Sequence, residues 1–339
     1  MLERINKKLK IFLAYSLGLL LLVSCAKQNP VVGLMLPHMH IQRYHIEKDE
    51  FTSRISALGG KVEFRSANND EQLQLAQLDS LLNEGIDVLV LDPVNRFTAA
   101  QMVRKAHAKG VKVISYDRLI SNCDVDAFLS FDAKMVGRQM AESLMKLKPA
   151  GNYILLEGDK TDINAIGIDQ GQQEILSPAI KSGSIHVMYK IFIEQWSQDE
   201  AALEVQHCID LLSGQVPDVI LAGSDDLAQG AIKTLQKDGL AGKVLVSGHN
   251  GDLSACKNIL KGFQQMTVYK PYKKLANTAA ELAFKMLNNK KVSDILETTM
   301  NNGKLNIPTH LLPTIPVTAA NMKSTIIADG IFTEQDLAK

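Results

Sequence analysis

The sequence predicts an α/β fold of two lobes, each built on a doubly wound parallel sheet. Continuous apolar runs alternate with segments of helical periodicity along most of the chain. An uninterrupted apolar run is typical of a strand that is covered on both faces, as in a parallel sheet. The chain has 339 residues, and with about ten strands it is too long for one compact domain. A closed eight-fold barrel is the alternative architecture.

The expected strands are short runs rich in Val, Ile and Leu. They cover residues 31–36, 88–91, 111–114, 153–156, 219–221 and 244–246. Because helical patterns lie between these runs, the strands are expected to be parallel neighbours joined by crossovers.

Apolar residues at a spacing near 3.6 predict the intervening helices. The first of them follows Asn68, Asn69 and Asp70, whose side chains are good N-caps, and it stops before Gly85. The second stops before Gly110 in the same way. In order, the expected helices cover residues 71–83, 98–108, 133–147, 165–180, 198–212, 227–237 and 273–287.

The beginning of the chain is predicted to be a targeting segment rather than part of the fold. Several basic residues precede a short apolar stretch at 11–23, and Ser24 and Cys25 follow at once. This pattern is similar to a bacterial lipoprotein signal, so residues 1–24 are expected to be a signal peptide and 25–30 a lipidated linker that begins at Cys25. An uncleaved membrane anchor is the alternative. Both interpretations place the rest of the chain outside the cytoplasm.

The charge balance and the motif search exclude several functions. The chain has 37 basic and 37 acidic side chains, without the basic cluster that a nucleic-acid groove needs. GxGxxG, the Walker A motif, HExxH and GxSxG are all missing from the sequence. His38, His40 and His45 could bind a metal, but no companion ligands stand at a fixed spacing, so we interpret them as loop or pocket histidines. We therefore expect no catalytic residue, no cofactor and no metal.

Three cysteines remain once Cys25 is set aside. Cys123, Cys208 and Cys256 form no CxxC or metal-binding pattern. We interpret them as small buried hydrophobic residues, which is a common role of cysteine. A disulfide between Cys208 and Cys256 is the alternative.

Polar side chains follow the expected strands, where open parallel sheets bind ligands. Each single Asp or Asn there could equally be a helix cap. The polar residues in these positions are His38, His40, Gln42, Arg43, Tyr44, Asp92, Asn95, Asp117, Arg118, Asp132, Glu157, Asp159, Ser224, Asp225, His249 and Asn250.

Among them, Asp117 and Arg118 indicate a ligand with several hydroxyl groups. The carboxylate accepts hydrogen bonds from hydroxyls, while the guanidinium donates to hydroxyl oxygens, so one sugar satisfies both. A surface ion pair of little energy is the alternative. Trp196, the only tryptophan, and Tyr44 are candidates for stacking on the apolar face of a sugar. Trp196 could instead be a lid over the core.

Several segments resemble the periplasmic sugar-binding proteins of the ribose-binding type. The stretch from Leu58 to Pro93 carries the general resemblance. Further segments are similar to the xylose-binding subgroup of this family, and the similarity spans nearly all of the chain after the signal peptide. These segments are residues 43–44, 61–68, 116–118, 130–132, 266–271, 275–280 and 299–303.

The resemblance implies a periplasmic binding protein of type I, in which a monosaccharide lies between two lobes and hinge closure encloses it. The N-terminal lobe is expected to hold residues 31–132 and 270–311, and the C-terminal lobe residues 133–269 and 312–339. The three hinge crossovers are expected near 132–133, 269–270 and 312–316. The implied partners are a monosaccharide, D-xylose first, and an ABC permease in the inner membrane. We expect a monomer held to the membrane through Cys25 in the periplasm.

The resemblance also carries over a set of sugar-contacting positions. Those that match the family are Arg43, Asp117, Arg118, Asn164, Trp196 and Lys270. Four aligned positions depart from its pattern: Tyr44 replaces a Trp, Ser224 an Asn, Asn250 an Asp, and Asp169 an Arg. Tyr44, Ser224 and Asn250 are still expected to contact the ligand, but the departures bear on which sugar is bound.

Two other function classes are compatible with these residues. The protein could be the ligand-binding component of a sensor that presents its closed state to a membrane receptor. It could instead be an enzyme acting on sugars, with Asp117 and Asp225 as a carboxylate pair.

Overall fold

The structure is a computed structural model that describes residues 29–211, 215–288 and 290–338. The predicted signal peptide and Cys25 lie outside the described residues and stay predictions. Among the helices that are described, none has both the length and the apolar character needed to cross a membrane.

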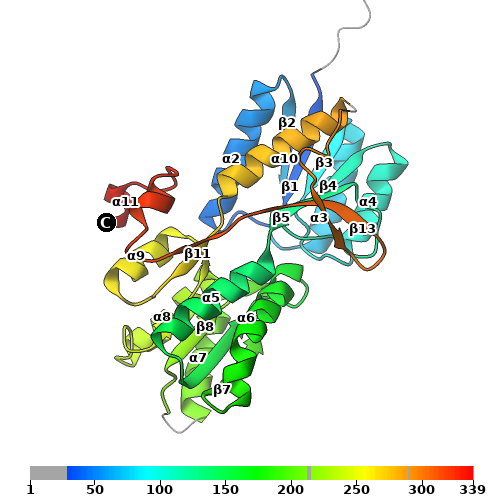
Figure 1. Ribbon diagram of the computed structural model, residues 1–339. Helices are drawn as coiled ribbons and strands as arrows, with labels where there is room; N and C mark the ends of the chain where they lie inside the picture. The colour runs from blue at the N-terminus through cyan, green and yellow to red at the C-terminus, as the bar shows by residue number, and fades with distance from the viewer. Residues whose placement is uncertain (1–28, 212–214, 289, 339) are drawn as a thin grey trace, which may run out of the picture. The chain divides into compact units, whose positions relative to one another are not determined.

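The first lobe is built on a seven-stranded sheet with the strand order β12-β13-β5-β4-β3-β1-β2. All neighbours are parallel except β12 and β13. The strands are β1 (Val31–Leu36), β2 (Lys61–Ser66), β3 (Val88–Leu91), β4 (Lys112–Tyr116), β5 (Ala127–Phe131), β12 (Thr298–Asn301) and β13 (Asn306–Leu312). The helices of this lobe are α2 (Gln42–Ala57), α3 (Glu71–Glu84), α4 (Ala99–Ala108) and α10 (Tyr272–Leu287), and in Figure 1 α2 and α10 lie side by side.

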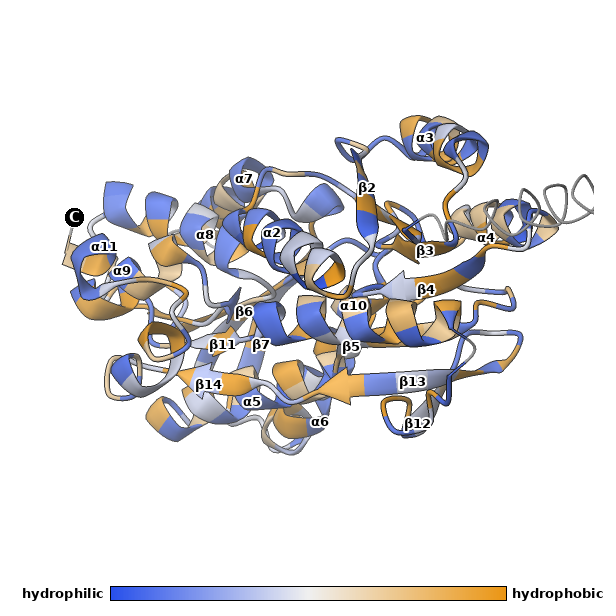
Figure 2. Cartoon of the chain, turned by 90° about the horizontal axis from the view of Figure 1, so that it is seen from above, coloured by the Kyte–Doolittle hydropathy of each residue, from blue (hydrophilic) through white to orange (hydrophobic). Residues whose placement is uncertain are grey.

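Both faces of this sheet are buried, which explains its uninterrupted apolar runs. In β1, Leu34 and Leu36 join one hydrophobic cluster with residues of α2 and α10, whereas Met35 joins the opposite cluster with residues of α3 and α4. Successive side chains of a strand point to opposite faces, so a strand covered on both sides has no polar positions. The helices, in contrast, carry both hydrophilic and hydrophobic residues (Figure 2).

The second lobe contains two smaller sheets. Four parallel strands have the order β7-β6-β8-β9, and three more have the order β10-β11-β14. The strands are β6 (Gly151–Glu157), β7 (Ile185–Phe192), β8 (Val219–Ala222), β9 (Leu245–Val246), β10 (His249–Asn250), β11 (Thr267–Tyr269) and β14 (Ile315–Val317). One hydrophobic cluster holds α5 (Ala133–Leu147) and α6 (Ile163–Lys181) against the first of these sheets, and another holds α7 (Gln198–Leu211) and α8 (Asp225–Lys237). The lobe also contains η1 (Glu194–Trp196), α9 (Leu253–Lys261), η2 (Lys323–Ile327) and α11 (Glu334–Ala338).

The α/β prediction with two parallel-sheet lobes is confirmed. All six expected strands and all seven expected helices are present, with small differences at their ends. The closed-barrel alternative is wrong because each sheet is open, with β12 and β2 at the edges of the largest one. The chain passes between the lobes after β5, after β11 and after β13.

Several polar residues after strands do serve as helix caps. Asp70 accepts hydrogen bonds from the backbone N–H groups of Gln72 and Leu73 at the start of α3. Gly85 ends that helix in the left-handed conformation, with φ 86°. Asp132 and Ser224 likewise accept from backbone N–H groups in the first turns of α5 and α8, as N-cap residues do.

The cysteine prediction is confirmed for the three described cysteines. Cys123, Cys208 and Cys256 are free and buried. The alternative of a Cys208–Cys256 disulfide is wrong. The physical reason is that Cys208 packs between α7 and the four-stranded sheet, whereas Cys256 belongs to a separate cluster around α9 and the C-terminal segment.

Candidate functional site

All nine ligand-contacting residues predicted from the sequence line one cavity of about 320 Å³. This first cavity lies between the lobes, at the carboxyl ends of strands from both. Its volume is in the range of small-molecule sites. The nine residues are Arg43, Tyr44, Asp117, Arg118, Asn164, Trp196, Ser224, Asn250 and Lys270. Asp169, where the sequence departs from the family pattern, does not line this cavity and forms an ion pair with Lys190 at 2.5 Å.

Arg43 and Asp117 form the buried centre of the site. A terminal nitrogen of Arg43 lies 2.7 Å from Oδ2 of Asp117, and its Nε lies 3.0 Å from a carboxylate oxygen of Glu47. Burial opposes both charges, yet Asp117 and Glu47 outweigh it and raise the pKa of Arg43. Burial likewise opposes ionisation of Asp117, but Arg43, Lys270 and Arg118 hold its pKa well below the usual range. Asp117 is therefore a carboxylate at neutral pH.

One oxygen of Asp117 is available to a ligand. Its Oδ1 is buried and accepts no hydrogen bond from any described residue, while Nζ of Lys270 lies 4.0 Å away. A buried acceptor without a donor is costly in a folded protein. A hydroxyl group placed between Asp117 and Lys270 would satisfy this oxygen.

The backbone at Asp117 is held in an unusual conformation. Asp117 has φ 58°, in the left-handed region. Its carbonyl oxygen accepts hydrogen bonds from the hydroxyl of Ser130 at 2.6 Å and from the side-chain amide of Asn164 at 3.1 Å. Strain of this kind persists only where the surroundings enforce it, and it gathers at functional sites.

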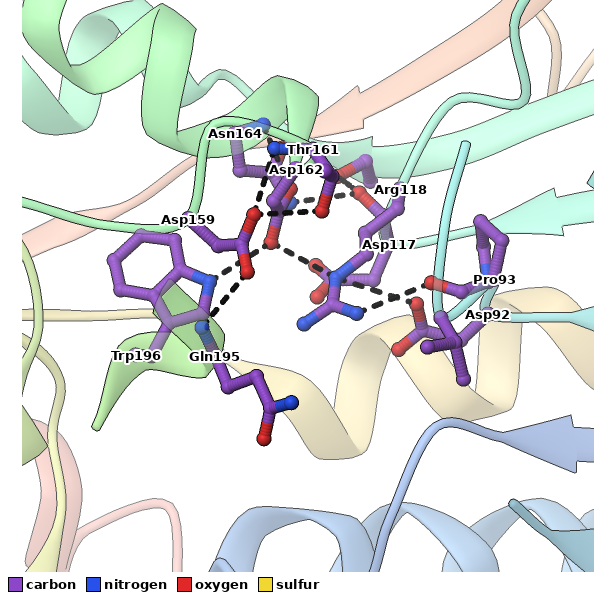
Figure 3. Close-up of polar contacts among 12 residues, drawn as sticks. Asp92, Pro93, Asp117, Arg118, Asp159, Thr161, Asp162, Asn164, Gln195 and Trp196 are labelled. Carbon is purple, nitrogen blue, oxygen red and sulfur yellow. Dashed lines mark hydrogen bonds and ion pairs between the residues drawn. The ribbon is translucent and has the colours of Figure 1, made fainter. Parts of the chain in front are cut away.

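Arg118 and Trp196 meet at one carboxylate that sequence reasoning did not identify. Asp162 Oδ2 lies 2.8 Å from Nε of Arg118 and accepts the indole N–H of Trp196 at 3.2 Å (Figure 3). Arg118 also donates to the carbonyl oxygen of Pro93 at 3.1 Å. Asp162 caps α6 as well, since it accepts from the N–H of Asn164. Arg118 belongs to the first lobe and Asp162 to the second, so this pair bridges the cavity.

Trp196 both covers the core and lines the cavity. Its indole packs so closely on Gly158 that a Cβ there would lie 2.2 Å from the ring. The indole also lies edge-on to the imidazole of His249, with ring centroids 5.8 Å apart. Gln195 and Trp196 have φ 50° and 57°. Trp196 therefore packs against the core, as the lid alternative expects, and it also lines the cavity, while its stacking on a ligand stays a prediction.

The side chains of Tyr44, Ser224 and Asn250 already make hydrogen bonds within the protein. Tyr44 donates its hydroxyl to Asp92 at 3.0 Å, and its ring is 2% exposed. Ser224 accepts from the N–H of Leu227 at 3.2 Å, which leaves its own hydroxyl proton free. Asn250 accepts weakly from Arg43 at 3.5 Å.

The cavity has further lining residues that the sequence did not single out as site residues. They are His38, His40, Ile41, Asn69, Asp162, Gln195, Gln198, Asp226 and His249. Burial and the positive charge of Arg118 lower the pKa of His38 to about 3, so this imidazole is neutral. His38 and His40 were noted in the sequence because they follow a strand. Asp162 and Gln195 lie near expected elements, but no pattern in the sequence marks them as lining residues.

Asp225 does not line the first cavity, contrary to the carboxylate pair that an enzyme would require. Its carboxylate accepts from the backbone N–H groups of Gly251 and Asp252, from the hydroxyl of Thr267 and from the amide of Gln264, all at 2.9–3.0 Å. Asp225 is buried and holds the loop that carries Asn250. The suggested pair of Asp117 and Asp225 is therefore wrong.

The charges around the first cavity favour a neutral ligand. Arg43, Arg118 and Lys270 face three carboxylates, those of Asp117, Asp162 and Asp226. Donors and acceptors are thus both present without an excess of either charge, which suits a polyhydroxyl compound. Among the described residues, no group of three or more His, Cys, Asp or Glu side chains is arranged to hold a metal ion.

Comparison with known proteins gives a consistent picture. Residues 32–291 match the family described as the periplasmic binding protein domain. The chain is 38% identical to the D-xylose-binding periplasmic protein of Haemophilus influenzae, over 90% of this chain and 91% of that protein. It is 37% identical to the protein of the same name from Escherichia coli, over 90% and 92%. An ABC transporter solute-binding protein of Clostridium phytofermentans, solved with bound β-D-glucose, superimposes with a TM-score of 0.84 at 26% identity, over 91% of this chain and 99% of that one.

Proposed function

We propose, given that this chain belongs to the periplasmic binding protein family, that it captures D-xylose in the first cavity and delivers it to an ABC sugar permease. The family consists of substrate-binding transport proteins rather than enzymes. The choice of D-xylose rests on the two relatives that share 37–38% of its residues. The observation that carries the proposal is the buried Oδ1 of Asp117, which accepts no hydrogen bond from any described residue and lies among donors that line a sugar-sized cavity.

The proposed binding mode assigns a task to each kind of side chain. Asp117 accepts a hydroxyl proton through Oδ1, while Arg43, Arg118 and Lys270 donate to hydroxyl oxygens. Asn164, Ser224 and Asn250 offer further polar atoms. The indole of Trp196 covers an apolar C–H face of the ring. The sugar exchanges hydrogen bonds with water for bonds with the protein, and no covalent step is involved.

Capture couples to hinge closure in this proposal. We assign residues 31–132 and 270–311 to one lobe and 133–269 and 312–339 to the other, with the hinge at the three passages between them. Contacts that join the lobes support this assignment: Arg118 with Asp162, Asn164 with Asp117, and Arg43 with Asn250. A ligand that touches both sides favours the closed state by its differential affinity for that state.

We further propose that the protein works in the periplasm as a monomer anchored through a lipid on Cys25. The names of the relatives support a periplasmic location, and the N-terminal pattern of basic residues, apolar stretch and cysteine supports the anchor.

The decisive test is a titration of the purified mature protein with D-xylose, followed by fluorescence of the single tryptophan and by calorimetry. We expect saturable binding with a Kd on the micromolar scale, which corresponds to about 8 kcal/mol. Ribose, arabinose, glucose, galactose and fructose serve as controls. Saturation by one of these sugars and not by D-xylose would contradict the assignment of the ligand. If no sugar gave a fluorescence change or a heat of binding, sugar capture itself would be contradicted.

A further inference from the structure

A second cavity of about 370 Å³ adjoins the first. The two cavities share six lining residues, which are His38, Asn69, Arg118, Asp162, Gln195 and Trp196. The second cavity is as large as the one that we assign to a sugar ring, so a ring of the same size would fit beyond the shared border. Its remaining lining residues are Glu71, Val94, Asp159, Lys160, Thr161, Phe192 and Glu194.

The six shared residues form the border between the two cavities. Some of their side chains are held by hydrogen bonds and ion pairs, whereas others are not. Asp162 holds both Arg118 and Trp196, which fixes these three side chains (Figure 3). Asn69 and Gln195, in contrast, make no side-chain hydrogen bond with any other described residue, although the two backbones adopt left-handed conformations with φ 61° and 50°. Asn69 and Gln195 thus combine a strained backbone with an unused side-chain amide at the same border. This combination indicates a ligand that crosses the border.

The second cavity has the chemistry of a sugar subsite. Phe192 contributes a half-buried aromatic ring, and Nζ of Lys160 and of Lys190 lie 5.2 Å and 5.7 Å from its centroid. Of these two lysines only Lys160 lines the cavity, and its side chain is exposed. The ring can stack on the C–H face of a sugar once the Lys160 ammonium group moves aside or donates to a hydroxyl. Glu194 is exposed and has no ion-pair partner among the described residues, so its carboxylate is free to accept from hydroxyls.

The charge of the second cavity excludes acidic ligands. Four carboxylates line it, those of Glu71, Asp159, Asp162 and Glu194, against the two cations Arg118 and Lys160. A sugar phosphate or a uronic acid would bring more negative charge into this surrounding, whereas a neutral sugar ring would not.

We infer that the site accepts a neutral disaccharide of xylose, with one ring in the first cavity and the second ring between Phe192 and Asn69. This inference rests on the proposed function, which it extends from a single sugar ring to a short xylo-oligosaccharide. The glycosidic bond then crosses the border beside Arg118, where the amides of Asn69 and Gln195 contact it.

The test compares xylobiose with D-xylose by calorimetry on the mature protein. We expect xylobiose to bind with a Kd no weaker than that of D-xylose. Phe192→Ala is expected to raise the Kd of xylobiose by about five- to tenfold, which is the scale of one aromatic stacking contact, and to leave that of D-xylose within about twofold. Phe97→Ala is the matched control, because Phe97 is also a surface ring beneath a cation, that of Arg96, and lines neither cavity.

A second measurement needs no variant. In saturation-transfer NMR, protons of both xylobiose rings are expected to receive magnetisation from the protein. Transfer to only one ring, or unchanged xylobiose affinity in a folded Phe192→Ala protein, would show that the second cavity is not a subsite. Binding of D-xylose without any binding of xylobiose would overturn this inference and leave the proposed function standing, whereas failure of both sugars would overturn both.

Discussion

At the scale of single residues, the site depends on charges that are buried but not fully satisfied. Asp117 and Arg43 neutralise each other at 2.7 Å, yet within the described part of the chain Oδ1 of Asp117 accepts no hydrogen bond. The pair therefore neutralises two buried charges, and it also takes part in the binding mode that we propose. If Asp117 is removed, the guanidinium of Arg43 keeps only one of its two buried ion pairs, the one with Glu47. Such a loss in the interior costs more than the loss of a surface ion pair.

Asp117→Asn is expected to weaken D-xylose binding by about 2 kcal/mol or more, because it replaces a charged acceptor by a neutral one. Calorimetry measures the affinity, and thermal unfolding checks the fold. Asp117→Ala is expected to destabilise the protein by about 1–3 kcal/mol as well, since Arg43 then keeps only Glu47 as its ion-pair partner in the interior. Unchanged affinity in the Asn variant would remove Asp117 from the ligand contacts.

Glu47 makes the stability of this buried cluster depend on pH. Burial raises the pKa of Glu47 to about 7, although Arg43 partly opposes the shift. An acid whose pKa is higher in the folded state favours folding at low pH, and this contribution is lost as the pH rises from about 4.5 through about 7. The free energy of unfolding of the wild type relative to Glu47→Gln should therefore fall by about 3 kcal/mol across that range, at about 1.36 kcal/mol per pKa unit. Denaturant titrations at pH 4.5 and 7.5 measure it, and a constant difference would contradict the shift.

At the scale of elements, the second lobe depends on an unusually close contact between α5 and α6. A Cβ at Gly171 would lie 2.0 Å from the carbonyl oxygen of Lys134, and one at Gly137 would lie 2.0 Å from that of Ile168. The helices approach this closely only because each has a glycine at the crossing. The start of α6 carries Asp162 and Asn164, so the crossing also positions two side chains of the site.

Gly171→Ala is expected to lower the free energy of unfolding by about 1–3 kcal/mol, the range for overpacking, despite the better helix propensity of alanine. Gln170→Ala is the matched control, since Gln170 is exposed in the same turn of α6. Chemical denaturation compares the two variants with the wild type. Equal stability of both variants would show that α6 can shift without cost.

At the scale of the whole molecule, two open parallel sheets present their carboxyl edges to one cavity. Three passages of the chain connect the lobes, and these passages form the hinge that we propose. Contacts such as that of Arg118 with Asp162 join the two lobes across the cavity. This architecture is that of a family of substrate-binding transport proteins.

The attachment of the molecule to a membrane is tested at the N-terminus. Cys25→Ala is expected to move the protein from the membrane to the soluble fraction, because it removes the thiol to which we propose that the lipid is attached. Fractionation of cells followed by immunodetection measures the distribution, with Cys208→Ala as a control that leaves the signal intact. Retention of the Cys25→Ala protein in the membrane would favour an uncleaved anchor.

The sequence predicted six of the strands and seven of the helices, because continuous apolar runs and 3.6-residue periodicity arise from local burial. It did not predict others, such as α2 and α9. It also determined the nine lining residues, through strand ends and family resemblance. Only the tertiary structure decided which polar groups have partners. Asp162 joins Arg118 to Trp196, and Asp225 supports a loop instead of facing the cavity. The second cavity likewise exists only in the tertiary structure. Residues such as Asn69, Lys160 and Phe192 come together only when distant segments fold against each other.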